Sequence, residues 1–84
     1  MKLPVIKKLA SDRTISEDDI NKAIKILEII SDARGVKEEE LDVIGELISN
    51  LEGSKIVINE HRHYGVPLKE ALNKFMQRVI NSIK

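Results

Sequence analysis

Apolar side chains recur every three or four residues along nearly the whole chain, which is the spacing of a helix face. Four segments carry this pattern, and short polar stretches that contain Gly, Ser or Pro separate them. A chain of 84 residues has the length of one domain. We therefore predict an all-α fold, in which residues 1–84 form a single domain of about four helices in a small bundle.

The second segment has the sharpest predicted ends. Ser16 precedes three acidic residues, so it supplies an N-cap and the carboxylates favour the positive end of the helix dipole. At the other end, Gly35 follows Arg34 and suits the left-handed conformation that closes many helices. A shorter helix over about residues 3–10, with Pro4 in its first turn, is predicted before it.

The second helix carries more apolar surface than one small domain needs. At 100° per residue its apolar side chains cover roughly 220° of the circumference, whereas a helix with one buried face needs about 100°. They are Ile20, Ala23, Ile24, Ile26, Leu27, Ile29, Ile30 and Ala33. We therefore expect this helix to be covered on two sides.

The third segment changes its pattern near Gly53. Before the glycine, apolar residues at positions 41–51 hold one face of a helix that starts with an acidic run at residues 38–40. After the glycine, Ile56 and Val57 lie about 100° apart and away from that face.

Two interpretations of this change remain open. The helix continues to about His63 and is buried on several sides, or it breaks at Gly53 and residues 55–58 are extended, as their β-branched side chains favour. We favour the long helix, because a single strand has nothing to pair with in a monomer.

The surplus apolar residues predict a partner interface formed by Ile26, Ile29, Ile56 and Val57. Exposed apolar patches of several hundred Å² mark interaction sites. We therefore expect a non-enzymatic protein–protein interaction module. The simplest partner is a second copy, in a homodimer that acts as an adaptor or modulator of an unknown protein.

The last helix is predicted from Leu68 onward, after the turn at residues 65–67. Its polar half has the amide and cationic side chains that read bases and phosphates, namely Lys69, Asn73, Lys74, Gln77 and Arg78. With the helix before it, this face predicts the alternative function, a small nucleic-acid-binding regulator. The 14 basic and 14 acidic side chains give no net charge, which argues against binding to a polyanion.

The only cluster of ligand-type side chains lies at residues 60–63. Glu60 and His63 lie one turn apart on a helix face, a unit that di-iron sites of helical bundles use twice. A metal site would need a second copy, so a solvated helix end is the favoured interpretation. The chain has no Cys, Gly-rich phosphate loop or nucleophile motif, and we expect no enzymatic activity and no cofactor.

The chain carries no predicted membrane or export segment. Its first apolar run is too short for a signal peptide, and no stretch approaches the roughly 20 apolar residues that span a bilayer. We therefore expect a cytoplasmic protein.

Three stretches carry a resemblance to a known group of proteins: residues 2–7, 40–50 and 69–73. They resemble a small family of short, uncharacterised bacterial proteins. The resemblance implies an all-helical domain without a known activity, and it transfers no site residue.

Overall fold

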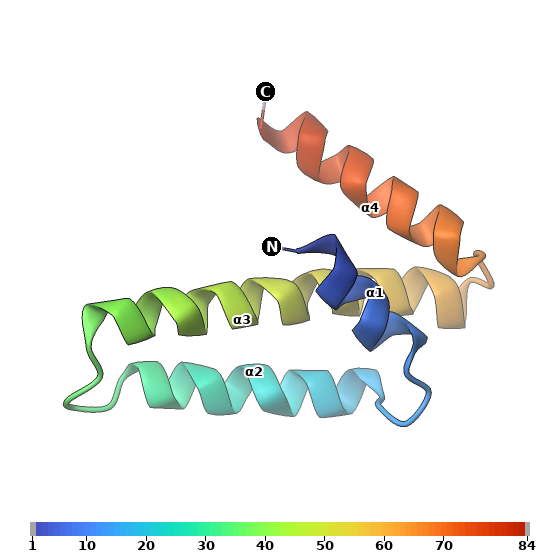
Figure 1. Ribbon diagram of the computed structural model, residues 1–84. Coiled ribbons are helices and arrows are strands. Elements are labelled where there is room, and N and C mark those ends of the chain that lie inside the picture. The colour runs from blue at the N-terminus through green and yellow to red at the C-terminus, as the bar shows by residue number, and fades with distance from the viewer. Residues whose placement is uncertain (1, 84) are drawn as a thin grey trace.

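The computed structural model describes residues 2–83, with side chains from Lys2 to Asn81. Four α-helices and one π-helical turn follow one another in this part of the chain, which contains no strand (Figure 1). They are α1 (Leu3–Ser11), α2 (Glu17–Ser31), α3 (Glu38–Ile58), the π-helical turn η1 (Asn59–His63) and α4 (Leu68–Ile83). The all-α prediction is confirmed.

α3 runs through Gly53 without a break, which confirms the long-helix interpretation. Residues 55–58 are helical, and the Asn59 N–H at the end of α3 donates to the carbonyls of Lys55 and Ile56. η1 then continues the helical path for five more residues. The extended alternative for residues 55–58 is wrong, because α1, α2 and α4 pack on this helix and bury its apolar side chains without any sheet.

α2 starts at the predicted residue, but it ends before the predicted C-terminal end at Arg34 and Gly35. Ser16 Oγ accepts from the Asp19 N–H at 3.2 Å, and Asp19 Oδ2 accepts from the Ser16 N–H at 2.9 Å, so the two residues form a capping box. The helix ends at Ser31, where the Asp32 N–H turns to the carbonyl three residues back. Gly35 has the expected positive φ, +87°, but it lies within the loop rather than at the helix end.

α2 and α3 form an antiparallel hairpin, and α1 and α4 both pack at one end of it (Figure 1). We call this end the base; it includes α3 from residue 50 onward. The opposite end, residues 25–49, is the tip. α4 leaves the hairpin at the base and points away from it (Figure 1). The molecule is a thin slab of 43 × 34 × 16 Å.

The buried apolar core lies at the base. Its members are Ile6, Ala10, Ile20, Ile24, Val57, Ile58, Ala71, Leu72 and Phe75. At Gly53, a Cβ atom would lie 2.8 Å from Ile6 Cδ1 and 2.9 Å from Phe75 Cζ, so the missing side chain lets α1 and α4 approach α3. In the tip, by contrast, no side chain is buried.

The start of α1 is anchored to α3 by Asn50, a polar side chain that is only 4% exposed. Its Oδ1 accepts from the backbone N–H of Lys2 at 2.7 Å. α1 therefore stands as a ridge on one side of the hairpin. Within residues 2–83, no helix is long and apolar enough to cross a membrane.

Candidate interaction surface

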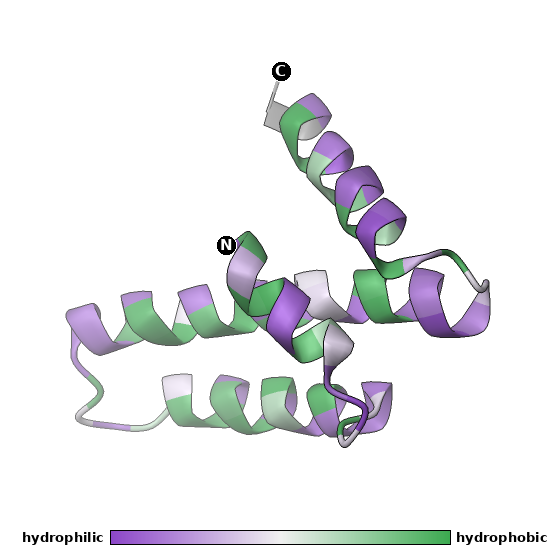
Figure 2. Ribbon diagram, turned by 45° about the vertical axis from the view of Figure 1, so that its right-hand side comes forward, coloured by the Kyte–Doolittle hydropathy of each residue, from purple (hydrophilic) through white to green (hydrophobic). Residues whose placement is uncertain are grey.

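Large apolar side chains are exposed on both helices of the tip. On α2, Ile26 and Ile29 are 57% and 62% exposed, and on α3, Val43 and Leu47 are 59% and 45% exposed. Figure 2 shows hydrophobic segments along both helices where they extend beyond the base. The chain therefore carries apolar surface that it does not cover itself.

On α3, the exposed residues continue the row that α1 covers at the base. Val43 lies two turns before the buried Asn50 and four turns before the buried Val57, so the three share one side of the helix. Leu47, one turn after Val43, lies on the same side. α1 has nine residues and α3 has 21, so α1 is too short to cover the whole row.

On α2, Ile26 and Ile30 extend this exposed side. Ile20 and Ile24 are buried against α3. Ile30 lies about 80–120° round the helix from them, and Ile26 lies about 120–160° round in the same direction. α2 and α3 run antiparallel, and α1 lies on one side of their hairpin (Figure 1). In antiparallel helices, residues displaced in the same rotational sense from the contact face lie on the same side of the pair. This part of α2 therefore lies on the same side of the hairpin as Val43 and α1. We call the resulting surface the tip patch; it consists of Ile26, Ile30, Val43 and Leu47.

A shallow groove joins the tip patch to the ridge of α1. It is lined by Lys2, Val5, Asp42, Val43, Glu46, Leu47 and Asn50. Its apolar residues come from α1 (Val5) and α3 (Val43 and Leu47), and charged side chains of both signs lie around them. An apolar centre with a polar rim is the usual composition of a protein interface.

The four predicted interface residues do not share one surface. Ile26 belongs to the tip patch, and Ile29 is exposed on the side of α2 that faces away from α3. Ile56 is 41% exposed, but it lies at the base beside Glu17 of α2. Val57 is wrong as an interface residue, because its side chain is fully buried in the core.

Sequence reasoning did not identify Val43 and Leu47 as exposed apolar residues. It placed them on the one apolar face that residues 41–51 form on the third helix. The available signal was the length of the first helix, since about eight predicted residues cannot cover a helix that continues to His63.

The side chains of η1 tie the base together. Glu60 Oε1 lies 3.0 Å from an Arg78 guanidinium nitrogen of α4, and His63 Nε2 lies 3.2 Å from Glu17 Oε1 of α2. Glu60 and His63, the pair considered for metal, therefore contact different helices. Within residues 2–83, no group of three His, Cys, Asp or Glu side chains is placed to hold a metal ion.

Two further η1 side chains, those of His61 and Arg62, contact backbone carbonyls. Arg62 donates to the carbonyls of Ile15 at 2.6 Å and Asp12 at 2.8 Å, so its guanidinium holds the loop between α1 and α2. His61 Nδ1 lies 2.7 Å from the carbonyl of Val66, in the turn before α4. The whole cluster thus contacts the chain's own helices and loops.

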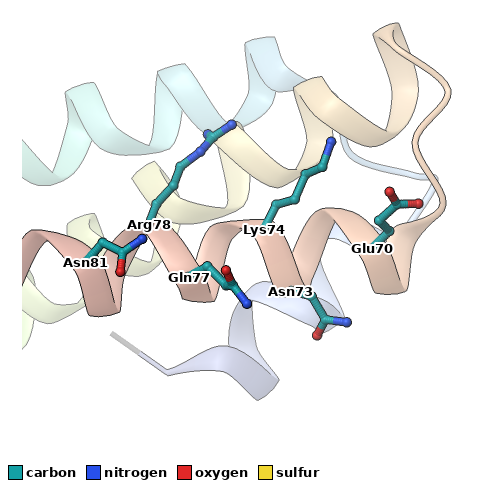
Figure 3. A pocket seen from close by; sticks show the side chains of 6 residues that line it. All are labelled: Glu70, Asn73, Lys74, Gln77, Arg78 and Asn81. Carbon is teal, nitrogen blue, oxygen red and sulfur yellow. The ribbon is translucent and has the colours of Figure 1, made fainter.

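The residues of the alternative nucleic-acid face are all exposed on α4: Lys69, Asn73, Lys74, Gln77 and Arg78. In Figure 3, Lys74 and Arg78 extend to one side of the helix and Asn73 and Gln77 to the other. Glu70 lies on the same face, and Glu60 pairs with Arg78. The two carboxylates weaken the attraction of this face for phosphate.

Charge is segregated between the tip and the ridge, although the net charge is zero. In residues 37–46, Lys37 is the one basic residue among five acidic ones, Glu38, Glu39, Glu40, Asp42 and Glu46. Residues 2–8 carry Lys2, Lys7 and Lys8 and no acidic residue. The tip is therefore acidic and the ridge is basic.

The chain belongs to a family of unknown function, DUF6952, whose model matches residues 1–84. No curated protein and no solved structure matches the chain. Membership confirms the resemblance to short, uncharacterised helical proteins. It brings no activity and no site residue with it.

Proposed function

We propose that this family member is a non-enzymatic protein–protein interaction module that self-associates through the tip patch. One observation carries the proposal. The side of α3 on which Asn50 bonds to the start of α1 continues to Val43 at the tip, where this side chain is 59% exposed. An apolar row that is half covered by its own chain is completed by a partner at its other half.

The amount of exposed surface supports this proposal. The accessible surface is 6104 Å², whereas a compact monomer of 9.5 kDa exposes about 5000 Å². The radius of gyration, 13.8 Å, also exceeds the value of about 12 Å for a compact chain of 84 residues. The excess surface of roughly 1000 Å² is similar to the area of about 800 Å² that each partner buries in a standard interface.

A homodimer is the simplest assembly, because closed twofold pairs are the commonest oligomers. Such a dimer would leave the outer face of α2 and the polar face of α4 free to contact another protein. This arrangement suits an adaptor or modulator. Nucleic-acid binding through α4 ranks second, since Glu60 and Glu70 lie among its cations.

Sedimentation equilibrium at about 1 to 100 μM chain tests the proposal, a range that covers ordinary dimer affinities. We expect the mass of a dimer. Leu47→Lys puts a charge in the tip patch and should raise the dimer Kd by more than about tenfold. The matched control is Ile56→Lys in the same helix, because Ile56 and Leu47 are 41% and 45% exposed.

Circular dichroism establishes that both variants are helical before their masses are compared. A wild-type chain that stays monomeric throughout would show that self-association is wrong. A wild-type dimer whose two variants dissociate equally would show that the tip patch is not the interface.

A further inference from the structure

We infer that the occupant of the tip patch is the α1 ridge of a second copy, in a twofold dimer where each acidic tip meets the partner's basic ridge. This inference rests on the proposed function and adds the geometry and the charges of the interface. It predicts which two surfaces meet, and therefore which substitutions compensate one another.

Shape is the first observation. On one side of the hairpin the base carries α1 as a ridge, and the tip beside it consists of α2 and α3 alone (Figure 1). On this side the base is therefore raised by the thickness of α1 (the high half), and the tip is not (the low half). A second copy turned over by a twofold axis places its low half on the first copy's high half, and the reverse contact follows by symmetry.

The exposed side chains of the two halves match. The low half offers the tip patch, whose Val43 and Leu47 are 59% and 45% exposed. The ridge offers Pro4 and Val5, both exposed, between its lysines. Apolar contact at the centre would therefore be reciprocal, with each ridge resting on the other copy's tip patch.

Charge is the second observation. On α3, Glu39 and Asp42 flank Val43 and are exposed, and on α1, Lys7 and Lys8 are exposed. Among the described side chains, Glu39, Asp42 and Lys7 take part in no ion pair within the chain. The twofold arrangement brings the tip carboxylates to the partner's ridge lysines, and it does so twice in each dimer. A parallel arrangement would instead set tip against tip and place like charges together.

Reciprocal charge reversal tests this geometry. The tip variant carries Glu39→Lys and Asp42→Lys, and the ridge variant carries Lys7→Glu and Lys8→Glu. Each variant alone faces like charges at both contacts, so its dimer Kd should rise at least about tenfold. In a mixed dimer both contacts regain opposite charges, so the mixture should form a heterodimer with a Kd within about threefold of the wild-type value.

Native mass spectrometry separates the heterodimer from both homodimers, because the two variants differ in mass. Raising the salt concentration should weaken the wild-type dimer, since these charges are solvent-exposed. Neutral versions, Glu39→Gln with Asp42→Asn and Lys7→Gln with Lys8→Gln, replace the reversed ones if the charges unfold a helix end. Each neutral version should weaken the dimer less than charge reversal and reduce its dependence on salt.

The outcomes separate this inference from the proposed function. A monomeric wild-type chain would overturn both. A wild-type dimer that neither charge reversal weakens would overturn the tip-to-ridge geometry and leave self-association standing. Dissociation of both variants without recovery in the mixture would also overturn the geometry, because complementary charges would then not be in contact.

Discussion

The two halves of α3 belong to one helix and have different surroundings. At the base, Gly53, Ser54, Val57 and Ile58 are buried, because α1, α2 and α4 all pack on this half. At the tip, residues 38–49 contain no buried side chain. The base therefore holds the fold together, and the tip is the half that we propose for contact with a partner.

The difference follows from the lengths of the neighbouring helices. α1 is short and α4 diverges, so neither follows α3 to the tip (Figure 1). Only α2 accompanies α3 along both halves. A helix hairpin that outgrows its own core presents apolar side chains on a rigid support, which is a suitable geometry for binding another chain.

The largest difference between the halves should appear when the same side chain is shortened in each. Val57→Ala removes fully buried carbon atoms from the core, so we expect a loss of about 2–3 kcal/mol in the free energy of unfolding. Val43→Ala removes carbon atoms that are largely exposed, and we expect a change within about 0.5 kcal/mol.

Urea denaturation at about 1 μM chain measures both variants while association is weak. At higher concentration Val43→Ala should lose stability relative to the wild-type chain, because the proposed dimer would contribute to stability there. Equal losses for the two variants at low concentration would contradict the division into base and tip.

The two glycines inside α3 should respond in opposite directions to the same substitution. Gly53→Ala crowds Ile6 and Phe75, which costs about 1–3 kcal/mol, whereas the gain in helix propensity is about 1 kcal/mol. We expect a net destabilisation. Gly45→Ala meets no atom within 4 Å, so only the gain of about 1 kcal/mol remains.

Thermal unfolding measures this pair, since 1 kcal/mol shifts the Tm of a domain of this size by about 4–8 °C. Combining Gly53→Ala with Ile6→Val removes the Cδ1 atom that lies closest to the new methyl group. The double variant should show a smaller packing penalty than the sum of the two single changes. Stabilisation by both glycine substitutions would show that α1 and α4 do not cross α3 closely at Gly53.

Much of the fold was predictable because its signals are local. Helical spacing gave the all-α fold, and the residues after Ser16 gave the start of α2. The continuity of α3 followed from excluding a lone strand. The tight packing at Gly53 was not predictable, because it depends on α1 and on Phe75, which lie far away in sequence.

The interaction surface was less predictable for the same physical reason. Ile56 and Val57 are neighbours in sequence, and the position of α1 and α4 decides which of the two is covered. Likewise, Glu60 and Arg62 hold the base together through hydrogen bonds to Arg78 and to the Ile15 carbonyl, which lie 18 and 47 residues away in sequence. The surplus of apolar residues on α2 was visible in the sequence. The exposure of Val43 and Leu47 was indicated only indirectly, by the short length of the first helix.

The smallest expected effect distinguishes the helix starts at the two ends of the hairpin. At the base, α2 begins with the complete Ser16–Asp19 box, and the hydrogen bonds from Ser16 hold the pKa of Asp19 below its usual value of 3.8. At the tip, α3 begins with only one such bond, from the Lys37 N–H to Glu40 Oε1 at 3.0 Å, because a lysine side chain offers no acceptor.

Asp19 should therefore make the stability of the fold depend slightly on pH in the acidic range. A carboxyl group whose pKa is lowered on folding stabilises the folded state above its unfolded pKa, and this contribution is lost as the pH falls from about 3.8 through the lowered value. Thermal unfolding between about pH 2 and pH 6 should show this loss, and Asp19→Asn should remove it. Asp18→Asn, which changes the neighbouring carboxylate outside the box, should retain it. If both variants keep the same acid dependence as the wild-type chain, the box does not stabilise α2, and the two helix starts are equivalent.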